Sequence, residues 1–240
     1  MIQRVGDRFA ILGVPGSMPA SALRAPRDTA AGATYYPWVR VSAGAGEPIL
    51  IPAVGHIAGA YAKSDLERGV QNSPAGREIN GLLSTSQGGT GSLEFELASD
   101  EIGRLKRMGI NAITCDDNHV RMHTALTMSI DTQSMDLATQ RLRLFITKSI
   151  YFGTTWALFE PNDEQLWTEL RARVSEFLKG VWESGALAGR TAEEAFFVRC
   201  GRDTMTQDDI DNRRIVLLLG LSLLSTPEPS TLNFGMYQAW

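Results

Sequence analysis

The sequence has 240 residues with 43% hydrophobic and 21% charged side chains, values ordinary for a globular protein, and its net charge of −4 argues against a nucleic-acid binder that relies on a basic field. Its two cysteines, Cys115 and Cys200, are too few for a disulfide framework and lack metal-ligand spacing, so we expect two buried thiols. The longest apolar run is the ten residues 215–224, where a membrane span needs about 20. We therefore expect neither membrane insertion nor a nucleic-acid partner.

The first half of the chain predicts short strands and two helices. A strand is expected from Arg8 to Leu12, and Pro37 favours a bend or an edge within the aromatic stretch YYPWVRV. A helix should begin near Pro52, since apolar residues then recur on one helical face: Val54, Ile57, Ala58 and Tyr61. Residues 93–97 (LEFEL) alternate like a strand, and a short helix capped by Ser99 should end at Gly109.

The middle of the chain predicts a hairpin, a helix and a further strand. The segments NAITC (111–115) and VRMHTALTMS (120–129) are strand-like and are joined by DDNH, a turn sequence. A helix is expected over 136–151, ended by Gly153, with a core face formed by Leu142, Phe145, Ile146 and Ile150. Residues 155–160 (TWALFE) should form the next strand.

The segment from Asn162 to Trp182 predicts a long amphipathic helix. Asn162 should cap it, with Gln165 completing a capping-box-like pair, and Gly185 should end it. One apolar stripe has helical spacing: Leu166, Leu170, Val174, Phe177, Val181 and Trp182. The opposite face carries Arg171, Arg173, Glu176 and Lys179, which form either a solvated face or a docking surface for an acidic partner.

The last part of the chain predicts strands and an arm. TAEE (191–194) resembles a capping box, and strands are expected at AFFVRC and at 215–224. After Pro227 and Pro229, which suit an extended hinge, apolar residues alternate with small or polar ones. The alternation indicates a terminal strand built to reach away from its own domain, with inter-subunit contacts from Leu232, Phe234, Met236 and Tyr237.

Together these elements predict an α/β to α+β fold, with a mixed sheet flanked by helices and an extended C-terminal strand or arm. Neither an internal repeat nor a low-complexity linker is evident, so we expect a single domain over residues 1–224 and the arm over 225–240.

Candidate catalytic and metal motifs fail on spacing. His119 and His123 are four residues apart in a predicted strand, which separates them by about 13 Å and is too far to share an ion. The calcium-like QDDIDN (207–212) has Arg214 at the glycine position and better suits the acidic first turn of a helix. The glycine-rich loop at 86–92 lacks the Lys-Ser/Thr of a phosphate loop. We expect no catalytic residue, no metal and no cofactor.

Several motifs occur in an order that resembles the contractile phage tail sheath family, whose members also serve contractile injection systems. They are GHIAGAYAKSDLERGVQNSPAG (55–76), LRLFITKSIYFGTTWALFEPNDEQLW (142–167), GALAGRTAEEAFFVRC (185–200) and the Asp-Ile-Asp of DDIDNRR. RFAIL and YYPWVRV match upstream pieces, so the resemblance extends from about Arg8 to Phe234.

The resemblance implies a structural subunit that polymerises helically around an inner tail tube and contracts to drive that tube through a target envelope. It implies partners in further copies of the chain, the tube protein, and baseplate and tail terminator proteins, and a place in a virion tail assembled in the bacterial host cytoplasm. Relatives hold the tube through a basic helix of the C-terminal region. Arg171, Arg173 and Lys179 are the candidates here, with Arg141, Arg143 and Lys148 on the preceding helix as competitors.

Two departures keep alternatives open. Relatives are expected to be longer, with an N-terminal arm and further strands before the equivalent of RFAIL, which suggests a fragment or a minimal subunit; the C-terminal close also lacks the aromatic–aliphatic ending of relatives. The first alternative is a terminator or baseplate-proximal subunit of the same machine. The second, from another class, is an α/β enzyme or ligand-binding domain with a pocket beside His56 or the glycine loop at Gly88 and Gly89.

Overall fold

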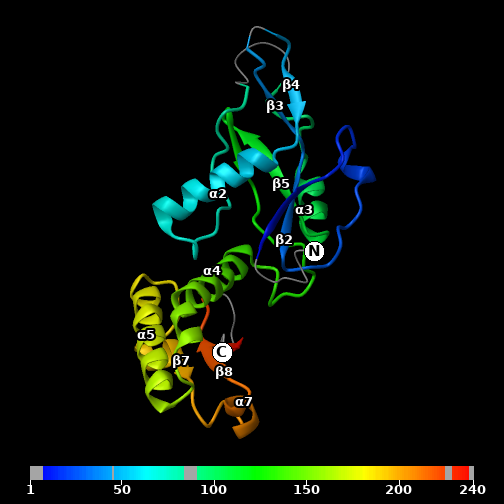
Figure 1. Ribbon diagram of the computed structural model, residues 1–240. Coiled ribbons are helices and arrows are strands. Elements are labelled where there is room, and N and C mark those ends of the chain that lie inside the picture. Colours follow the sequence, from blue (N-terminus) through cyan, green and yellow to red (C-terminus); the bar gives the residue numbers. More distant parts are fainter. Residues whose placement is uncertain (1–7, 45, 84–90, 225–228, 238–240) are drawn as a thin grey trace. The chain divides into compact units, whose positions relative to one another are not determined.

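The computed structural model describes residues 8–44, 46–83, 91–224 and 229–237. The chain divides into two compact units, residues 1–144 and 145–240, where the sequence predicts one domain up to residue 224 (Figure 1). The boundary falls inside helix α4 (Leu137–Gly153), which begins in the first unit and ends in the second. A continuous helix carries no Pro/Gly-rich linker, and this is why composition alone does not reveal the boundary.

The first unit is built on a four-stranded mixed sheet. Its strands are β1 (Ala10–Gly13), β2 (Gly32–Tyr36), β5 (Ile110–Asp116) and β6 (His119–Met122), in the order β1-β2-β5-β6. The first three are parallel, and β6 returns antiparallel through a turn at Asp117 and Asn118, both with positive φ. The predicted hairpin is therefore present, with a second strand shorter than expected.

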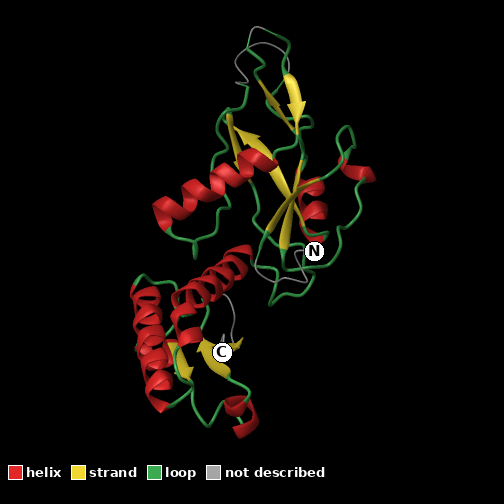
Figure 2. Cartoon of the chain, in the orientation of Figure 1, coloured by secondary structure: helices red, strands yellow, loops and turns green. Residues whose placement is uncertain are grey.

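Helices cover both faces of this sheet. On one face, Ile57 and Tyr61 of α2 (Val54–Arg68) pack with Tyr35 and Ile113. On the other, α3 (Ser99–Arg107) and the 3-10 turn η1 (Ala20–Ala22) form a second core around Tyr36 and Leu105. Alternate residues of β2 thus enter opposite cores, and all five are buried. The expected mixed sheet flanked by helices is confirmed (Figure 2).

The predicted strand at residues 93–97 is absent. A small antiparallel pair, β3 (Val39–Val41) and β4 (Ile49–Ile51), is present, and Leu93 makes only one bridge, to Val39. Beyond it Phe95 stacks on Tyr36, with ring centroids 6.1 Å apart. Packing of Phe95 under α3 takes the chain away from the ladder, and this overrides its strand-like alternation.

The second unit contains helices and a three-stranded antiparallel sheet of order β7-β8-β9. Its strands are β7 (Phe196–Arg199), β8 (Arg214–Leu221) and β9 (Ser230–Tyr237). Besides the end of α4, its helices are η2 (Thr155–Phe159), α5 (Glu164–Glu183), α6 (Ala192–Ala195) and α7 (Gln207–Asp211). Figure 1 shows α4 and α5 on one side of the sheet, with α7 near one end of β8.

One expected strand in this unit is wrong. Residues 155–159 form the 3-10 helix η2, because Thr154 caps the end of α4 by donating from its hydroxyl to the Ile150 carbonyl oxygen (2.7 Å). The tight turn then places Ala157 fully inside. The chain therefore makes a tight helical turn at residues 155–159, where a strand was expected.

The details of three helices also differ from expectation. The N-cap of α3 is Ala98, one residue before the predicted Ser99. Ala58, expected on the apolar face of α2, is exposed. On α4, Phe145 is 46% exposed. Asp163 caps α5 by accepting from the Leu166 backbone N–H (3.0 Å). The buried stripe of α5 contains Trp167 and Leu178, whereas the predicted Phe177 and Trp182 are half-buried. No described helix is long and apolar enough to cross a membrane.

Candidate interaction surfaces

The C-terminal strand lies on its own sheet. β9 pairs antiparallel with β8 along its full length, from Leu221 opposite Ser230 to Arg214 opposite Tyr237. Leu232 and Phe234 are half-buried, Met236 is 8% exposed, and Tyr237, on the outer face, is 68% exposed. The expected terminal strand is thus present, but the arm does not reach away from its own domain in this single chain.

The reason for this pairing is physical. Without β9, one edge of β8 would be an open row of backbone groups, and a strand of suitable alternation can satisfy them from the same chain or from another. The alternation that predicts an arm does not select between the two. Pro229 is exposed and directly precedes β9, whereas Pro227 lies outside the described residues. Pairing of Leu232, Phe234, Met236 and Tyr237 with a neighbouring copy stays a prediction.

The basic residues of α5 are partly engaged within the second unit. Arg173 donates to Glu169 Oε1 from Nε (2.9 Å) and Nη2 (2.7 Å), and it also stacks over the Trp156 ring, 4.7 Å from its centroid. Lys179 lies 3.8 Å from Glu183, one helical turn away. Both pairs are exposed, so they hold their cations only weakly and leave them available to a partner.

Arg171 has a different environment. Its guanidinium donates to the Cys200 carbonyl oxygen and to Thr168 Oγ1 (2.9 Å), and the residue is half-buried. The bond to Cys200 ties α5 to the segment after β7. Of the three predicted tube contacts, Arg173 and Lys179 are therefore the accessible ones, and Arg171 is mainly a packing residue.

The competing cation Arg141 has a structural role in the first unit. It forms a bidentate pair with Asp65 of α2, with Nη1 3.0 Å from Oδ1 and a closer contact between Nη2 and Oδ2. Its guanidinium also lies 4.7 Å from the centroid of Tyr61. With a side chain only 13% exposed, Arg141 is poorly placed to meet a partner.

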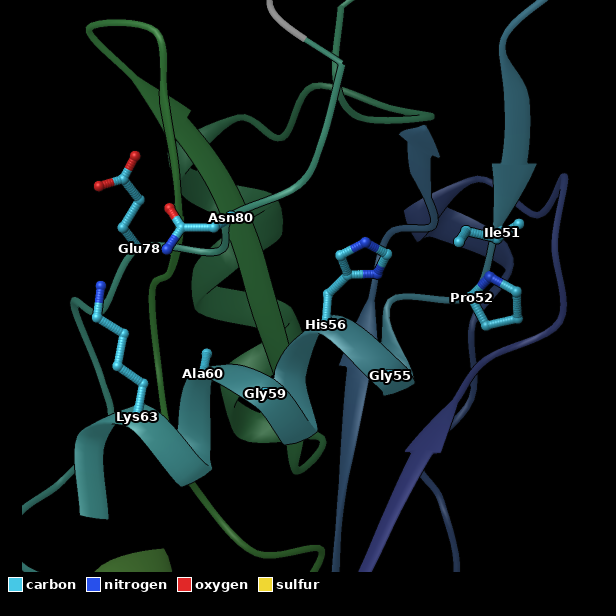
Figure 3. Close-up of a pocket in the computed structure, with 9 residues that line it drawn as sticks. All are labelled: Ile51, Pro52, Gly55, His56, Gly59, Ala60, Lys63, Glu78 and Asn80. Atoms are coloured by element: carbon cyan, nitrogen blue, oxygen red, sulfur yellow. The ribbon is translucent and has the colours of Figure 1, made fainter. Parts of the chain in front are cut away.

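An open pocket of about 480 Å³ lies along α2, beside His56 (Figure 3). His56 and Lys63 project from the same side of the helix toward a segment that carries Glu78 and Asn80. The Nδ1 atom of His56 is buried and makes no hydrogen bond within the described part of the chain. A catalytic His needs a hydrogen-bond partner, either to exchange a proton with or to orient its ring. The described residues bring no such partner to His56. Gly88 and Gly89 lie outside the described residues.

The other candidate ligands do not gather. His119 Nδ1 lies 2.9 Å from Glu78 Oε1, and this contact lowers the pKa of the Glu78 carboxyl. In the residues that the structure describes, no three His, Cys, Asp or Glu side chains come together as a metal site would require. Cys200 is buried and Cys115 is half-buried; both are free thiols, and burial raises the pKa of Cys200 to about 11.

Sequence reasoning missed the aromatic side chains that solvent reaches on the second unit. Tyr151 and Phe152 form an edge-to-face pair at the end of α4 (ring centroids 5.6 Å apart) and are 56% and 65% exposed. Phe159 is 64% exposed and Phe197 40% exposed. Helical or strand periodicity assigns apolar residues to the core. The signal that could have indicated exposure is that Tyr151 and Phe152 are consecutive in a helix and so cannot share one buried face.

Comparisons with solved structures show which known proteins share this fold. A chain from the cryo-EM structure of the anti-feeding prophage baseplate is 29% identical with a TM-score of 0.78, and the match covers 94% of this chain and 59% of that chain. A chain from the anti-feeding prophage helical sheath in its contracted state is 30% identical with a TM-score of 0.75, over 94% of this chain and 61% of that chain. A sheath tail protein from Listeria innocua, 14% identical, shares the fold with a TM-score of 0.72, over 99% of this chain and 51% of that chain.

This chain spans less than two thirds of the length of those chains. Neither the protein-family models nor the curated proteins compared with the sequence match it. The agreement with sheath structures nevertheless combines sequence identity with a shared fold over nearly the whole chain. The resemblance predicted from the sequence is therefore confirmed: over nearly its whole length this chain is similar to chains of contractile sheath and baseplate structures.

Proposed function

We propose that this chain is a structural subunit of a contractile sheath, which polymerises helically around an inner tube and shortens to drive the tube through a target envelope. The observation that carries the proposal is the 30% identity, at a TM-score of 0.75, to a chain of a contracted helical sheath. Since the described residues offer surfaces but no catalytic constellation, we also propose that the chain is not an enzyme.

Self-association is proposed to use β9. The strand exchanges from its own β8 to the β8 of a neighbouring copy and keeps the same register of eight pairs. Because an exchanged element makes the same contacts in either place, the exchange has a low cost. A strand that each subunit passes to the next makes a heterologous contact, which generates a filament when it is repeated by rotation and translation.

The inner tube is the proposed partner of α5. Arg173 and Lys179 are exposed and held only by i,i+4 carboxylates, so an acidic tube surface could recruit them by offering further oxygens. Baseplate and terminator proteins are proposed as the partners at the two ends of the polymer. A contractile tail or injection particle, assembled in the bacterial host cytoplasm, is the proposed location.

The test is reconstitution with a strand supplied in trans. A chain ending at residue 228 should fail to polymerise, and its β8 edge should bind a synthetic peptide of residues 229–240 because that peptide restores the eight-residue ladder. A peptide in which Leu232 and Phe234 are replaced by Asp is the matched control and should not bind. The full chain should form a helical layer around a tube in electron micrographs. Discrete, non-helical particles from the full chain with its partners would overturn the proposal.

A further inference from the structure

The central strand of the second unit is apolar on both faces. Alternate residues of β8 point to α4 and α5 and are fully buried: Ile215, Leu217, Leu219 and Leu221. The residues between them, on the opposite face, are Val216, Leu218 and Gly220. A strand whose outer face meets water normally alternates apolar with polar side chains, whereas continuous apolar strands are typical of sheets covered on both sides. The pattern of β8 therefore indicates that the outer face is covered in the working state.

Neighbouring strands add aromatic and basic side chains to this outer face. By register, Phe197 and Arg199 of β7 lie opposite Gly220 and Leu218, and Tyr237 of β9 lies opposite Arg214. Phe197 is 40% exposed and Tyr237 68% exposed. We name this surface the basic sheet face and define it by five residues: Phe197, Arg199, Val216, Leu218 and Tyr237.

Arg199 is the charged residue of the basic sheet face. Its guanidinium lies over the Phe197 ring, 5.2 Å from the centroid, and it makes no ion pair with any residue that the structure describes. Arg214, at the border of the face, is by contrast held by Asp209, at 3.0 Å. An apolar surface with an unpaired, exposed Arg at its edge fits a partner that offers apolar groups beside a carboxylate.

A surface of that chemistry occurs elsewhere on the same unit. Phe159, 64% exposed, and Ile210 of α7 line an open depression of about 430 Å³. On α7 beside it, Asp208 and Asp211 are exposed, and their carboxylates accept hydrogen bonds from the neutral side chains of Asn212 and Gln207. We name this surface the acidic edge and define it by four residues: Phe159, Asp208, Ile210 and Asp211. Arg213 also lines this depression, but the two carboxylates of the acidic edge outnumber its single positive charge.

We propose that the basic sheet face of one copy docks on the acidic edge of a second copy. Phe159 of the second copy covers Val216 and Leu218, and Asp208 and Asp211 approach Arg199. Because the two surfaces are different, the contact is heterologous and leaves one free surface of each kind at the ends of a pair. Every copy can then add another, so the contact supports stacking. This inference rests on the proposed function, since it supplies a second sheath–sheath contact beside the exchange of β9.

Charge reversal on each surface tests the docking. We expect Arg199→Glu and the pair Asp208→Arg with Asp211→Arg each to lower association at least about tenfold, because each places like charges face to face. Sedimentation velocity and negative-stain electron microscopy measure the association of the full chain. Lys106→Glu, an exposed basic residue of α3 in the other unit, is the matched control and should associate like the unaltered chain.

Mixing the two defective variants provides a control against misfolding. In the mixture, the reversed sheet face of one variant can meet the reversed acidic edge of the other, and their unaltered surfaces can meet in the same way. Both kinds of junction bring opposite charges together, so association should return to near its original level. Failure of the mixture to associate would overturn the pairing, as would unchanged association of either variant alone. If the unaltered chain associates but is indifferent to these changes, the docking fails while the proposed function stands. If the unaltered chain does not associate at all, both fail.

Discussion

The pair formed by Arg141 and Asp65 allows a quantitative prediction. Arg141, on the first part of α4, contacts both carboxylate oxygens of Asp65 on α2, and it also covers the ring of Tyr61. The Tyr61 hydroxyl is in turn 2.5 Å from that of Tyr35 in the core. The two charged side chains are only 13% and 29% exposed, so water screens their interaction incompletely.

Replacing Arg141 by Met removes the bidentate pair and the contact with the aromatic ring while keeping an apolar stem. Hydrogen bonds to charged groups contribute about 1.5–3 kcal/mol, and a cation over an aromatic ring contributes about 0.5–1 kcal/mol at partly exposed sites. Asp65 regains some water in the variant, so we expect a loss of about 2–3 kcal/mol from the first unit. Asp65→Asn should cost a similar amount, and the double variant should show a coupling of about 1–3 kcal/mol.

Hydrogen exchange measured by mass spectrometry on the full chain suits this prediction, because the chain has two units and one global transition would mix them. Peptides from α2 should lose protection in Arg141→Met. The matched control is Arg143→Met, a half-exposed residue two positions along the same helix, which should change stability by less than about 0.5 kcal/mol. Equal protection of α2 in the two variants would show that the Arg141 pair adds nothing to the docking of α4 on α2.

The remaining predictions concern packing, backbone conformation and ionisation. Leu170→Ala empties a fully buried position on α5 and should cost about 2–5 kcal/mol in urea unfolding of the second unit. Gly189→Ala should lower the free energy of unfolding by about 1–3 kcal/mol, since φ is +117° and a Cβ would lie 2.8 Å from the Ala195 backbone nitrogen. Gly180→Ala in α5, where the Cβ meets open space, should instead raise it by about 0.5–1 kcal/mol; thermal melts measure both. Burial raises the Cys200 pKa from 9.0 to about 11, so its contribution to stability is complete below pH 9 and is lost as the pH rises toward 11. Alkylation at pH 8, followed by mass spectrometry, should therefore label Cys200 only after unfolding; prompt labelling of the folded chain would contradict its burial.

Much of the fold follows from local sequence rules. Two signals mark the ends of α3: Asp100 and Glu101 at its start, and Gly109, with φ of +71°, after its end. From them the sequence predicts the start of this helix to within one residue. The failures come from tertiary packing. Phe95 leaves the predicted strand because its ring stacks on Tyr36. Trp167, which is not in the predicted apolar stripe, is buried, and its indole N–H donates to Asn162 Oδ1 (2.7 Å). Periodicity fixes which residues share a face, but only packing decides which face is covered.

The same limit explains why the C-terminal strand could be predicted while its partner could not. Leu232, Phe234 and Met236 alternate to fit the inner face of a sheet, and β8 supplies that face whether it belongs to the same chain or to another copy. The ladder is identical in both arrangements, so the free-energy difference lies in the connection at residues 222–229 and in the local concentration of neighbouring copies. A lone chain satisfies β8 from within, as in this structure. If copies sit side by side in the proposed sheath, the effective concentration of a neighbour's strand rises, and exchange then needs no new contact. The pairing of β9 seen in one chain is therefore compatible with the proposed exchange and supplies its register.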